Sequence, residues 1–540
     1  MLLLLLASQA SATPEALQLR LGALAEDPRV AGEAVADPLL LARFYEQQQF
    51  SAAWDSPAKF AALLAAIEES RRHGLLPADY HQDALTALLG AHTLAPTPAL
   101  AVKLDILATD ALARLAFHLR YGKVDPVQIE STWNFSPSLD GINPVEALRT
   151  LIEADRLGEA LDGLAPDGRY YRGLMDALAA YREIDARGGW RPVAEGETLR
   201  PGMTSPRVPA LRARLVVSGD QPAGEAEAED EFFDGSLEAA VKHFQHRHGL
   251  DPDGLVGRNT LAALNVSAAA RVDQLRVNME RARWVFGDLE ERFLLVNIAR
   301  FRVMLIERGQ VTWSTRAVVG QPFRQTPVFK ARMTYLEFNP TWTVPPTILR
   351  EDLLPELRRD PGALQRKNMT VLDFQGRPVD TAGIDWATIP ARGFPYIVRQ
   401  QPGANNALGR VKFMYPNPHH VYMHDTPARA LFGRAERAFS SGCIRLEKPF
   451  ELVNILLAGS EWDEAAIGRV LASGRTRVVN LPEPITVLML YGTAALEDGE
   501  IHFAKDVYNR DARLLEALDA PFSFNPSAGY QETVWGNAPP

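Results

Sequence analysis

The sequence has very little cysteine: Cys443 is the only one among 540 residues. A lone thiol excludes an intrachain disulfide, a paired-cysteine redox motif and a cysteine-rich zinc site. Three interpretations of Cys443 stay open, namely an inert core residue, an intermolecular disulfide and a catalytic nucleophile. The sequence around Cys443 is therefore the first place to look for a function.

Positive charge is also in deficit, because 57 Lys and Arg face 67 Asp and Glu, which gives a formal net charge of −10. An acidic chain of this kind is not expected to bind nucleic acid or anionic membrane surfaces in general. With 46% hydrophobic and 23% charged residues, the composition is that of an ordinary globular protein. Disordered, collagen-like and multi-span membrane classes are thereby excluded. At roughly 150 residues per domain, the length predicts three or four domains.

The chain begins with a short apolar run, Leu2–Leu6, which the small residues Ala10 and Ala12 follow. This run is far shorter than the roughly 20 residues that span a bilayer. The small residues fit a signal-peptidase site, although no basic residues precede the leucines. We predict residues 1–12 as the remnant of a signal peptide, and hence an exported protein. A single unpaired cysteine is unusual in an oxidising compartment, which favours a reactive thiol.

Apolar residues at helical spacing run through residues 13–195. Leu40, Leu41 and Phe44 are one example, and residues 100–118 repeat the pattern. Breaks that contain proline and glycine, such as 165–168, separate the helices. No group of residues here converges on a chemistry, so we interpret 13–195 as a helical scaffold domain.

A change in composition near residue 196 marks a second region. An acidic loop at 225–231 precedes the string "FDGSLEAAVKHFQHRHGLDPDGLVGRNTLAALN". Together with "RVPALRARL", this string resembles the small three-helix peptidoglycan-binding domain. The resemblance implies a domain at 196–268 in which residues 200–266 dock on wall glycan. His243, His246 and His248 have i, i+3, i+5 spacing and no nearby cysteine, so we predict a structural role for them and no metal site.

Residues 269–289 are predicted to form a connecting helix, after which the pattern changes to strands at 293–298, 302–306 and 485–491. We therefore expect a mainly-β domain at 290–511. A charged, helix-rich insertion at 347–393 is either a lid over a site or an excursion without function. Residues 512–540 are interpreted as a C-terminal tail. The predicted fold class is multidomain, with an α-helical scaffold, a small three-helix domain and a mainly-β domain that carries a helical capping insertion.

Cys443 lies in the sequence Ser440-Ser441-Gly442-Cys443-Ile444-Arg445 and follows His424 after nineteen residues. Small residues before the cysteine permit a tight turn in which backbone N–H groups converge. A thiol ionises near about pH 8.5, so a nucleophilic cysteine needs a basic or cationic partner. His424 ends a strand-like segment and is such a partner. From these residues alone, a catalytic pair and an inert cysteine both stay open.

The segment "HDTPARALFGRAERAFSSGCIRL" resembles the signature of the L,D-transpeptidase (YkuD-type) catalytic domain, which is a histidine, a spacer and then Ser-x-Gly-Cys-x-Arg. Many members have a histidine where Ser441 stands, and a serine is typical of the long, multidomain Gram-negative branch. Further matches to that branch are Gly320, Thr326-Pro327 and the segments 338–348, 399–417 and 491–511. The resemblance spans about 290–511, and the order of the domains agrees with it.

The resemblance implies a role for each residue of the motif. Cys443 is the expected nucleophile, and His424 is the expected base that forms the thiolate and later protonates the leaving amine. The backbone N–H groups of Ser441, Gly442 and Cys443 are the expected oxyanion donors. The carbonyl of Asp425 is expected to orient the imidazole, while its carboxylate either raises the pKa of His424 or faces solvent.

Three further side chains are expected near the substrate. Arg445 either binds a substrate carboxylate or holds the cysteine loop in place. Tyr422 and Trp342 are expected to line the acyl pocket, unless they are core aromatics. No cofactor is expected.

The reaction that the resemblance implies joins two peptidoglycan stems. The thiolate attacks the third residue of a tetrapeptide donor, releases the terminal D-alanine and forms a thioester, which an amine of a second stem opens to give a 3→3 cross-link. The resemblance also implies inhibition by carbapenems and a periplasmic, wall-associated location. An L,D-carboxypeptidase or endopeptidase that uses water shares the same residues and stays open. A non-catalytic wall-binding scaffold would tolerate the loss of His424 or Cys443, and both are present.

Overall fold

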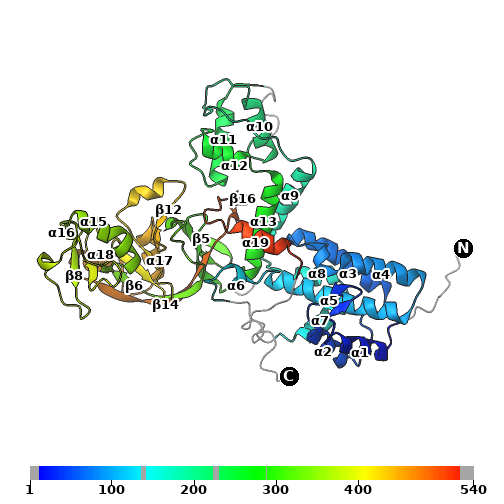
Figure 1. The fold of residues 1–540 in the computed structure, drawn as a ribbon. Helices are drawn as coiled ribbons and strands as arrows, with labels where there is room; N and C mark the ends of the chain where they lie inside the picture. Colours follow the sequence, from blue (N-terminus) through cyan, green and yellow to red (C-terminus); the bar gives the residue numbers. More distant parts are fainter. Residues whose placement is uncertain (1–10, 136–141, 223–229, 287–288, 523–540) are drawn as a thin grey trace.

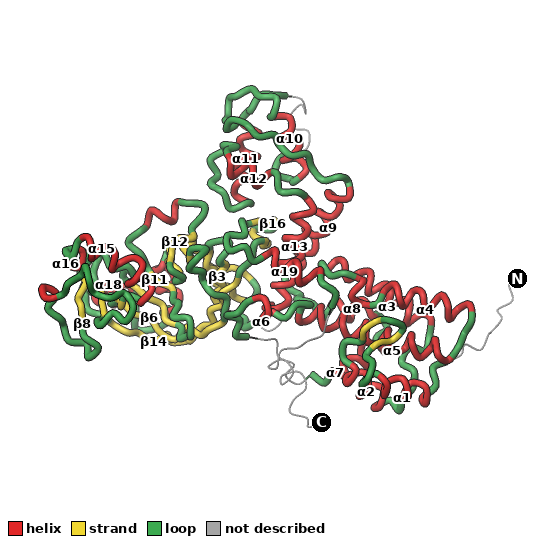
Figure 2. The backbone as a smooth tube through the Cα atoms, in the orientation of Figure 1, coloured by secondary structure: helices red, strands yellow, loops and turns green. Residues whose placement is uncertain are grey.

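The computed structural model of the chain describes residues 11–135, 142–222, 230–286 and 289–522. Residues 1–10 of the predicted signal-peptide remnant lie outside the described residues. Three bodies meet at a central helix, α13 (Ala268–Phe286), as Figure 1 shows. Figure 2 shows that the strands concentrate in one of these bodies and the helices in the other two. Within the described ranges, no helix is long and apolar enough to cross a membrane.

The N-terminal body is a set of helices, six of which begin with a capping residue and a proline. Thr13-Pro14 and Asn143-Pro144 are the first and last of these pairs. The cap side chain accepts a backbone N–H, and proline at the first position fixes a helical φ angle. The elements are α1 (Pro14–Ala23), β1 (Arg29–Val30), β2 (Glu33–Ala34), α2 (Pro38–Gln47), α3 (Pro57–Glu69), η1 (Ser70–His73), η2 (Pro77–Tyr80), α4 (Gln82–Leu94), α5 (Pro98–Tyr121), α6 (Pro126–Ile129), α7 (Pro144–Ile152), α8 (Leu157–Asp162) and α9 (Arg169–Ala186).

The second body consists of α10 (Val208–Val217), α11 (Gly235–Arg247) and α12 (Arg258–Leu264) around a core that includes Phe233 and Phe244. Gln245 organises the turn between α11 and α12. Its amide donates to Asp253 at 2.8 Å and to the Leu255 carbonyl at 2.9 Å. The helix α11 also contacts the β-rich body, because Arg247 donates to the Ile501 carbonyl at 2.7 Å.

The β-rich body is built on a nine-stranded sheet. Its strands are β3 (Arg292–Asn297), β4 (Arg302–Glu307), β5 (Gln310–Gly320), β6 (Lys330–Phe338), β10 (Val411–Met414), β11 (Met423–His424), β12 (Ala438–Ser440), β13 (Ile444–Leu446) and β14 (Arg477–Leu490). Their order is β12-β5-β13-β11-β10-β6-β14-β3-β4, and β5 also pairs with β4, so the sheet closes on itself. Outside the sheet lie η5 (Arg429–Gly433), α17 (Pro449–Leu456), α18 (Glu464–Ser473) and the hairpin β15 (Ala494–Glu497) with β16 (Glu500–Phe503).

The predicted capping insertion is a small subdomain with its own apolar core, which includes Leu354 and Trp386. Its helices come first: α14 (Pro346–Ile348), η3 (Leu349–Leu353), α15 (Leu354–Arg359) and α16 (Ala363–Arg366). The strand β8 (Met369–Leu372) and η4 (Thr381–Gly383) follow. A three-stranded sheet of order β7-β9-β8 joins the subdomain to the sheet body through β7 (Trp342–Thr343) and β9 (Ile397–Gln400). The insertion is therefore helical only in its first part.

The central helix α13 carries paired charges into the interior. Arg283 and Glu280 are fully buried and lie 2.5 Å apart. Glu280 also accepts the backbone N–H of Val124, and Arg283 donates to the His73 carbonyl at 2.8 Å, so each charge has further partners in the scaffold. A buried ion pair is tolerated only when its remaining hydrogen bonds are satisfied in this way.

The predicted C-terminal tail begins differently from the expectation. Its first residues belong to a helix, α19 (Asp511–Asp519), which packs against α13. Leu514 and Leu518 are buried and lie on one face of this helix, because they are four residues apart. Asp519 accepts from Arg276 of α13 at 2.6 Å. The few apolar residues of so short a segment were too weak a signal to predict the helix. The predicted fold class is confirmed, whereas the exact domain boundaries stay predictions.

Candidate active site

One face of the sheet carries a row of charged side chains from four neighbouring strands. β11 pairs with β13 so that His424 lies opposite Arg445. β10 pairs with β11 so that Lys412 lies opposite His424. β6 continues the row with Glu337 opposite Lys412, and their charged atoms are 3.8 Å apart. Because opposite residues of paired strands project from the same face, these four side chains form one line.

Cys443 directly precedes β13 and lies beside Tyr422. The Ile444 N–H donates to the Tyr422 carbonyl at 3.0 Å, and this hydrogen bond keeps Cys443 next to Tyr422. The thiol is half-buried, and its Sγ is 4.0 Å from the His420 carbonyl oxygen. Burial raises the pKa of Cys443, while Tyr422 and the cation of Lys412 act in the opposite direction. The thiol is therefore protonated in this structure at neutral pH.

His424 is only 3% exposed, and one nitrogen of its ring contacts the backbone. Its Nδ1 lies 2.5 Å from the Asp425 carbonyl oxygen, so Nδ1 carries the proton and Nε2 is left as the basic nitrogen. Burial, followed by the cation of Arg445, lowers the pKa of His424 to about 3. The imidazole is therefore neutral and able to accept a proton. Cys443 and His424 are both described, and no hydrogen bond joins them here; such contacts often tighten only when substrate binds.

The Asp425 carboxylate takes neither of the two roles expected for it. It accepts the Arg410 N–H at 2.9 Å, and its other oxygen is 3.5 Å from Arg429. It packs over Gly409, where an added Cβ would lie 2.4 Å from the carboxylate carbon. The carboxylate thus holds the loop before β10 and does not act on His424. Only the backbone carbonyl of Asp425 reaches the imidazole, as the sequence predicts.

The Arg445 side chain has no hydrogen bond or ion pair within the described part of the chain, and its Nε is buried without a partner. The alternative in which Arg445 holds the cysteine loop has no contact to support it. Burial lowers the pKa of Arg445, and the nearby Cys443 opposes that shift. A buried donor without a partner is costly, so Arg445 is left with hydrogen-bonding capacity for an anion.

Lys412 is a site residue that the sequence did not reveal. Its Nζ lies 4.1 Å from the centre of the Tyr422 ring, within the range of a cation–π contact. The Tyr422 ring in turn lies 5.8 Å from the His424 ring, centre to centre. Burial lowers the pKa of Lys412, and Glu337 partly restores it. The only signal in the sequence was one lysine in the short strand β10, which is too common a feature to single out.

The loop before Cys443 is folded by Ser440. The Ser440 hydroxyl donates to the Cys443 carbonyl at 2.6 Å and accepts the Gly442 N–H at 3.1 Å. Gly442 has a φ angle of 114°, a conformation that favours glycine. The Gly442 N–H is therefore occupied and is not available as an oxyanion donor. In the described part of the chain, the N–H groups of Ser441 and Cys443 have no such partner.

The other side of the cysteine loop is bonded to a turn at residues 320–326. Thr326 is fully buried, and its hydroxyl donates to the Gly442 carbonyl at 2.8 Å. The same hydroxyl accepts the Gly320 N–H at 2.9 Å. An added Cβ on Gly320 would lie 2.2 Å from the Arg324 carbonyl oxygen, so only glycine fits this turn. Gly320 and Thr326 were noted in the sequence as matches, without a role.

The capping subdomain contacts the cysteine loop through Arg324. This side chain donates to Ser441 Oγ at 2.9 Å, to Asp352 at 2.8 Å and to Glu351 at 2.7 Å. Trp342, on β7, lies beside the Tyr422 side chain and lowers its pKa, against the larger raising effect of burial. The cysteine loop therefore contacts the capping subdomain through Arg324, and Tyr422 has a neighbour on the strand that joins the subdomain to the sheet.

The three histidines of α11 and its following turn do not form a metal site. His243 contacts Asp220 at 2.9 Å and Glu500 at 3.0 Å, and His248 contacts the Phe244 carbonyl at 2.7 Å. His246 packs edge-on against His502. Among the residues that the structure describes, no group of three or more His, Cys, Asp or Glu is arranged to hold a metal ion.

Comparisons with known proteins find matches for three parts of the chain. Residues 291–476 match the family described as "L,D-transpeptidase catalytic domain", residues 204–264 match "Putative peptidoglycan binding domain", and residues 39–178 match "Scaffold domain". A curated relative from Haemophilus influenzae, named "Putative L,D-transpeptidase", is 38% identical over 241 residues. This match covers 45% of the chain and 48% of the relative, which is about half of its length.

A solved structure, that of an L,D-transpeptidase from Xylanimonas cellulosilytica, is 16% identical. The match covers 55% of this chain and 99% of that one, and its TM-score of 0.18 is too low to carry an argument about the fold. The three family matches fall in the order scaffold, peptidoglycan-binding domain and catalytic domain. Residues 291–476 therefore match the L,D-transpeptidase catalytic domain, in a multidomain chain in which residues 39–178 match a scaffold domain and residues 204–264 match a peptidoglycan-binding domain.

Proposed function

We propose that the protein is an L,D-transpeptidase that forms 3→3 cross-links in peptidoglycan through a thioester on Cys443. The observation that carries the proposal is the placing of His424 and Arg445 opposite each other on two paired strands, with Cys443 directly before one of them, within the matched catalytic domain. The donor is a tetrapeptide stem, and the acceptor is the side-chain amine of a diamino acid on a second stem.

The first half-reaction makes the thioester. Nε2 of His424 takes the thiol proton as Sγ of Cys443 bonds to the carbonyl carbon of the third donor residue. The C–N bond to the terminal D-alanine then breaks, and His424 gives its proton to the departing amine. Because burial lowers the pKa of His424 and raises that of Cys443, the pair is neutral before substrate binds. Proton transfer is thus coupled to the attack instead of preceding it.

The second half-reaction resolves the thioester. The acceptor amine attacks the thioester carbonyl and loses a proton to His424, the C–S bond breaks, and the proton returns to the thiolate. The carbonyl oxygen becomes an oxyanion in both halves. The N–H groups of Ser441 and Cys443 are the donors that we assign to it, and one such donor is worth roughly 3–4 kcal/mol in comparable sites.

Arg445 binds the terminal carboxylate of the donor stem in this proposal. Its guanidinium has no partner among the described residues, and a carboxylate is the ligand that a guanidinium fork fits best. Tyr422 and Trp342 form the wall beside Cys443. Residues 200–266 dock on wall glycan, which agrees with a periplasmic, wall-associated location and an exported chain. A carbapenem, which presents a strained carbonyl to the thiol, is expected to acylate Cys443.

The test uses the purified chain and a defined disaccharide-tetrapeptide. The wild type is expected to give 3→3 dimers, and Cys443→Ala is expected to give none while keeping its circular dichroism spectrum. Intact-protein mass spectrometry after a carbapenem is expected to show one adduct, on Cys443. Dimers made by Cys443→Ala would refute the proposed mechanism.

Water is the competing acceptor, and product analysis decides between the two activities. An L,D-carboxypeptidase converts tetrapeptide to tripeptide without forming a dimer. The capping subdomain favours the transferase, because Arg324 links it to the cysteine loop, Trp342 on the adjoining strand β7 lies beside Tyr422, and a covered site admits less water. Tripeptide as the sole product of the wild type would replace the transferase by the hydrolase.

A further inference from the structure

The peptide bond between Gly442 and Cys443 is held from the side away from the thiol. The Thr326 hydroxyl donates to the Gly442 carbonyl at 2.8 Å. In a planar trans peptide, the carbonyl and the following N–H point in opposite directions. The hydrogen bond from Thr326 therefore also fixes the direction of the Cys443 N–H, which has no partner in the described part of the chain.

Thr326 is itself clamped by Tyr508. The Tyr508 hydroxyl accepts the Thr326 N–H at 3.2 Å and donates to the Gly320 carbonyl at 2.6 Å. Tyr508 is 6% exposed, so these bonds lie in the interior. A threonine bonded on both its backbone and its hydroxyl has little freedom to rotate, and the same holds for the carbonyl that it contacts.

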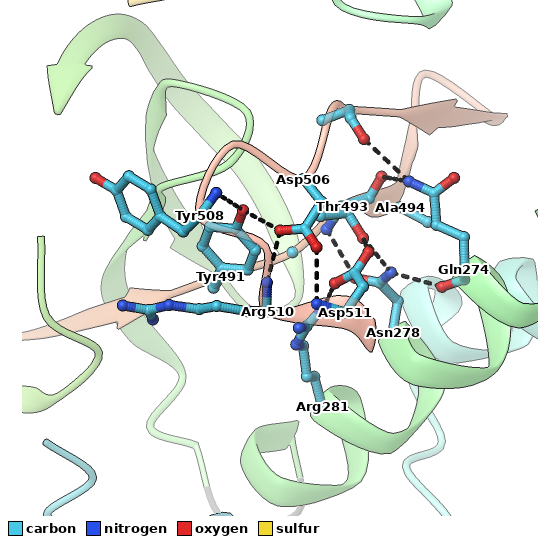
Figure 3. A network of polar contacts seen from close by, with 12 residues as sticks. Gln274, Asn278, Arg281, Tyr491, Thr493, Ala494, Asp506, Tyr508, Arg510 and Asp511 are labelled. Atoms are coloured by element: carbon cyan, nitrogen blue, oxygen red, sulfur yellow. Dashed lines mark hydrogen bonds and ion pairs between the residues drawn. The ribbon is translucent and has the colours of Figure 1, made fainter. Parts of the chain in front are cut away.

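Tyr508 is anchored to the central helices, as Figure 3 shows. Its backbone N–H donates to the Tyr491 hydroxyl at 2.8 Å, and the two rings stack with their centres 5.4 Å apart. The Tyr491 hydroxyl donates to Asp506, which also accepts the Asp511 N–H at 2.8 Å. Asp511 then accepts from Arg281 of α13 at 2.6 Å. The clamp thus rests on α13 and α19 and not on a surface loop.

We propose that Thr326 and Tyr508 are positioning residues that aim the Cys443 N–H at the oxyanion of the acyl-transfer step. The inference rests on the proposed function, because an oxyanion forms only if Cys443 attacks a carbonyl. It assigns a purpose to a hydrogen-bond chain that touches no substrate. The Gly442 N–H is already taken by Ser440, so the orientation of the Cys443 N–H carries much of the oxyanion stabilisation.

Two reactions of the same thiol separate positioning from simple reactivity. Acylation by a disaccharide-tetrapeptide passes through an oxyanion and needs the donors. Alkylation by iodoacetamide displaces iodide at a saturated carbon, so it forms no oxyanion and needs only the thiolate. A residue that aims the Cys443 N–H affects the first rate and leaves the second almost unchanged.

The experiment measures both rates by intact-protein mass spectrometry on the full chain. Thr326→Val keeps the shape of the side chain and removes the hydroxyl, so acylation is expected to fall about 10- to 100-fold while alkylation stays within about twofold. Thr326→Ser keeps the hydroxyl and is expected to restore most of the acylation rate. Tyr508→Phe is expected to lose less, about five- to tenfold, because Thr326 keeps its own bond to Gly442.

Tyr170→Phe is the matched control. Its hydroxyl donates to the Ala494 carbonyl at 3.1 Å and has no bond to the cysteine loop, so both rates are expected to stay unchanged. Normal acylation by Thr326→Val, or an equal loss of acylation and alkylation, would overturn the inference. If Thr326→Val does not fold, the ratio of the two rates in Tyr508→Phe decides by the same criterion. An unacylated wild type would instead refute the proposed function.

Discussion

The two sides of Cys443 are built in opposite ways. Toward the turn at 320–326, the polar groups are bonded to one another, from Gly442 through Thr326 to Tyr508. Toward β10 and β11, ionisable side chains are buried or half-buried and have few partners. The Arg445 side chain has none in the described residues, and the Tyr415 hydroxyl is buried without one. The first side fixes the geometry of the cysteine loop. The second side holds polar groups whose hydrogen-bonding capacity the protein leaves unsatisfied.

This difference matches what the two halves of an acyl-transfer site have to do. An oxyanion donor contributes only if it is already in place when charge develops, so it needs a rigid backbone. A group that binds the charged end of a substrate gains most when it has no competing partner and little water around it. The side toward the turn at 320–326 is therefore suited to hold an oxyanion donor in place. The side toward β10 and β11 is suited to bind a charged ligand.

The largest effect is expected from Arg445→Met. Loss of the unpartnered guanidinium removes the proposed carboxylate ligand, so kcat/KM for the tetrapeptide is expected to fall about 100-fold, mostly through KM, as for a charge-assisted hydrogen bond worth about 3 kcal/mol. The unfolding midpoint is expected to change little, because the Arg445 side chain makes no bond within the described chain. Steady-state kinetics and a thermal scan measure the two quantities.

Arg283→Met is the matched control, because the Arg283 side chain has several protein partners and lies away from the site. Arg283 is fully buried, pairs with Glu280 and donates to Tyr171, so its loss is expected to destabilise the fold by about 3–5 kcal/mol. A second control uses a tetrapeptide with an amidated C-terminus, on which wild type and Arg445→Met are expected to be equally slow. A persistent difference on the amidated donor would mean that Arg445 does not bind that carboxylate.

The parts of the molecule that local sequence specifies were predictable. Apolar residues at helical spacing, such as Leu40, Leu41 and Phe44, predict the scaffold helices, and the short Ser-x-Gly-Cys-x-Arg motif indicates Cys443 and Arg445. The family assignment and the fold class followed from such motifs and are confirmed. The family resemblance implied the carbonyl of Asp425 as partner of His424, and the structure places that carbonyl oxygen 2.5 Å from Nδ1.

What escaped prediction depends on contacts between residues far apart in the chain. Lys412 enters the site only because β10 pairs with β11, and nothing in a four-residue strand announces that register. The Asp425 carboxylate points away from His424 and packs over Gly409, which has no side chain to displace it. The two expectations, an effect on the pKa of His424 or exposure to solvent, came from the residue type alone and did not include this contact. The bond from Thr326 to Gly442 joins residues 116 positions apart, and only the folded sheet brings them together.

A smaller effect is expected from Lys412→Met, and its sign follows from the charge. Burial raises the pKa of Cys443, and the cation of Lys412 opposes that shift. Without the cation the thiol pKa rises further, so the pH profile of iodoacetamide alkylation is expected to move upward by about one pH unit, as one unit corresponds to about 1.4 kcal/mol. Alkylation at pH 7 is then expected to slow about tenfold.

Lys448→Met serves as the control for Lys412→Met. Lys448 is half-exposed and pairs with Glu451 at the surface, so its removal is expected to leave the alkylation profile in place. A profile for Lys412→Met that coincides with the wild type would show that the row of charges does not act on the thiol. The side toward β10 and β11 would then bind substrate without tuning the nucleophile.

The smallest effect is expected from Arg324→Gln. Arg324 connects Ser441 of the cysteine loop to Glu351 and Asp352 of the capping subdomain, and its loss frees the subdomain without changing the thiol or the clamp. Total thioester turnover is expected to stay within about twofold, as for partly exposed ion pairs. The ratio of tripeptide to dimer is expected to rise about two- to fivefold, because a looser cover admits water to the thioester.

Arg350→Gln isolates the contribution of Ser441 to this effect. Arg350 also pairs with Glu351, at 2.6 Å, but it is more exposed than Arg324 and lies within the subdomain itself. Its removal is therefore expected to leave the product ratio unchanged. If both variants raise tripeptide equally, the bond to Ser441 is irrelevant and only the charge balance of the cover matters. A change confined to Arg324→Gln instead means that the bond to Ser441 holds the capping subdomain over the thioester. The hydrogen-bonded turn at 320–326 would then control both the geometry of the cysteine loop and the access of water.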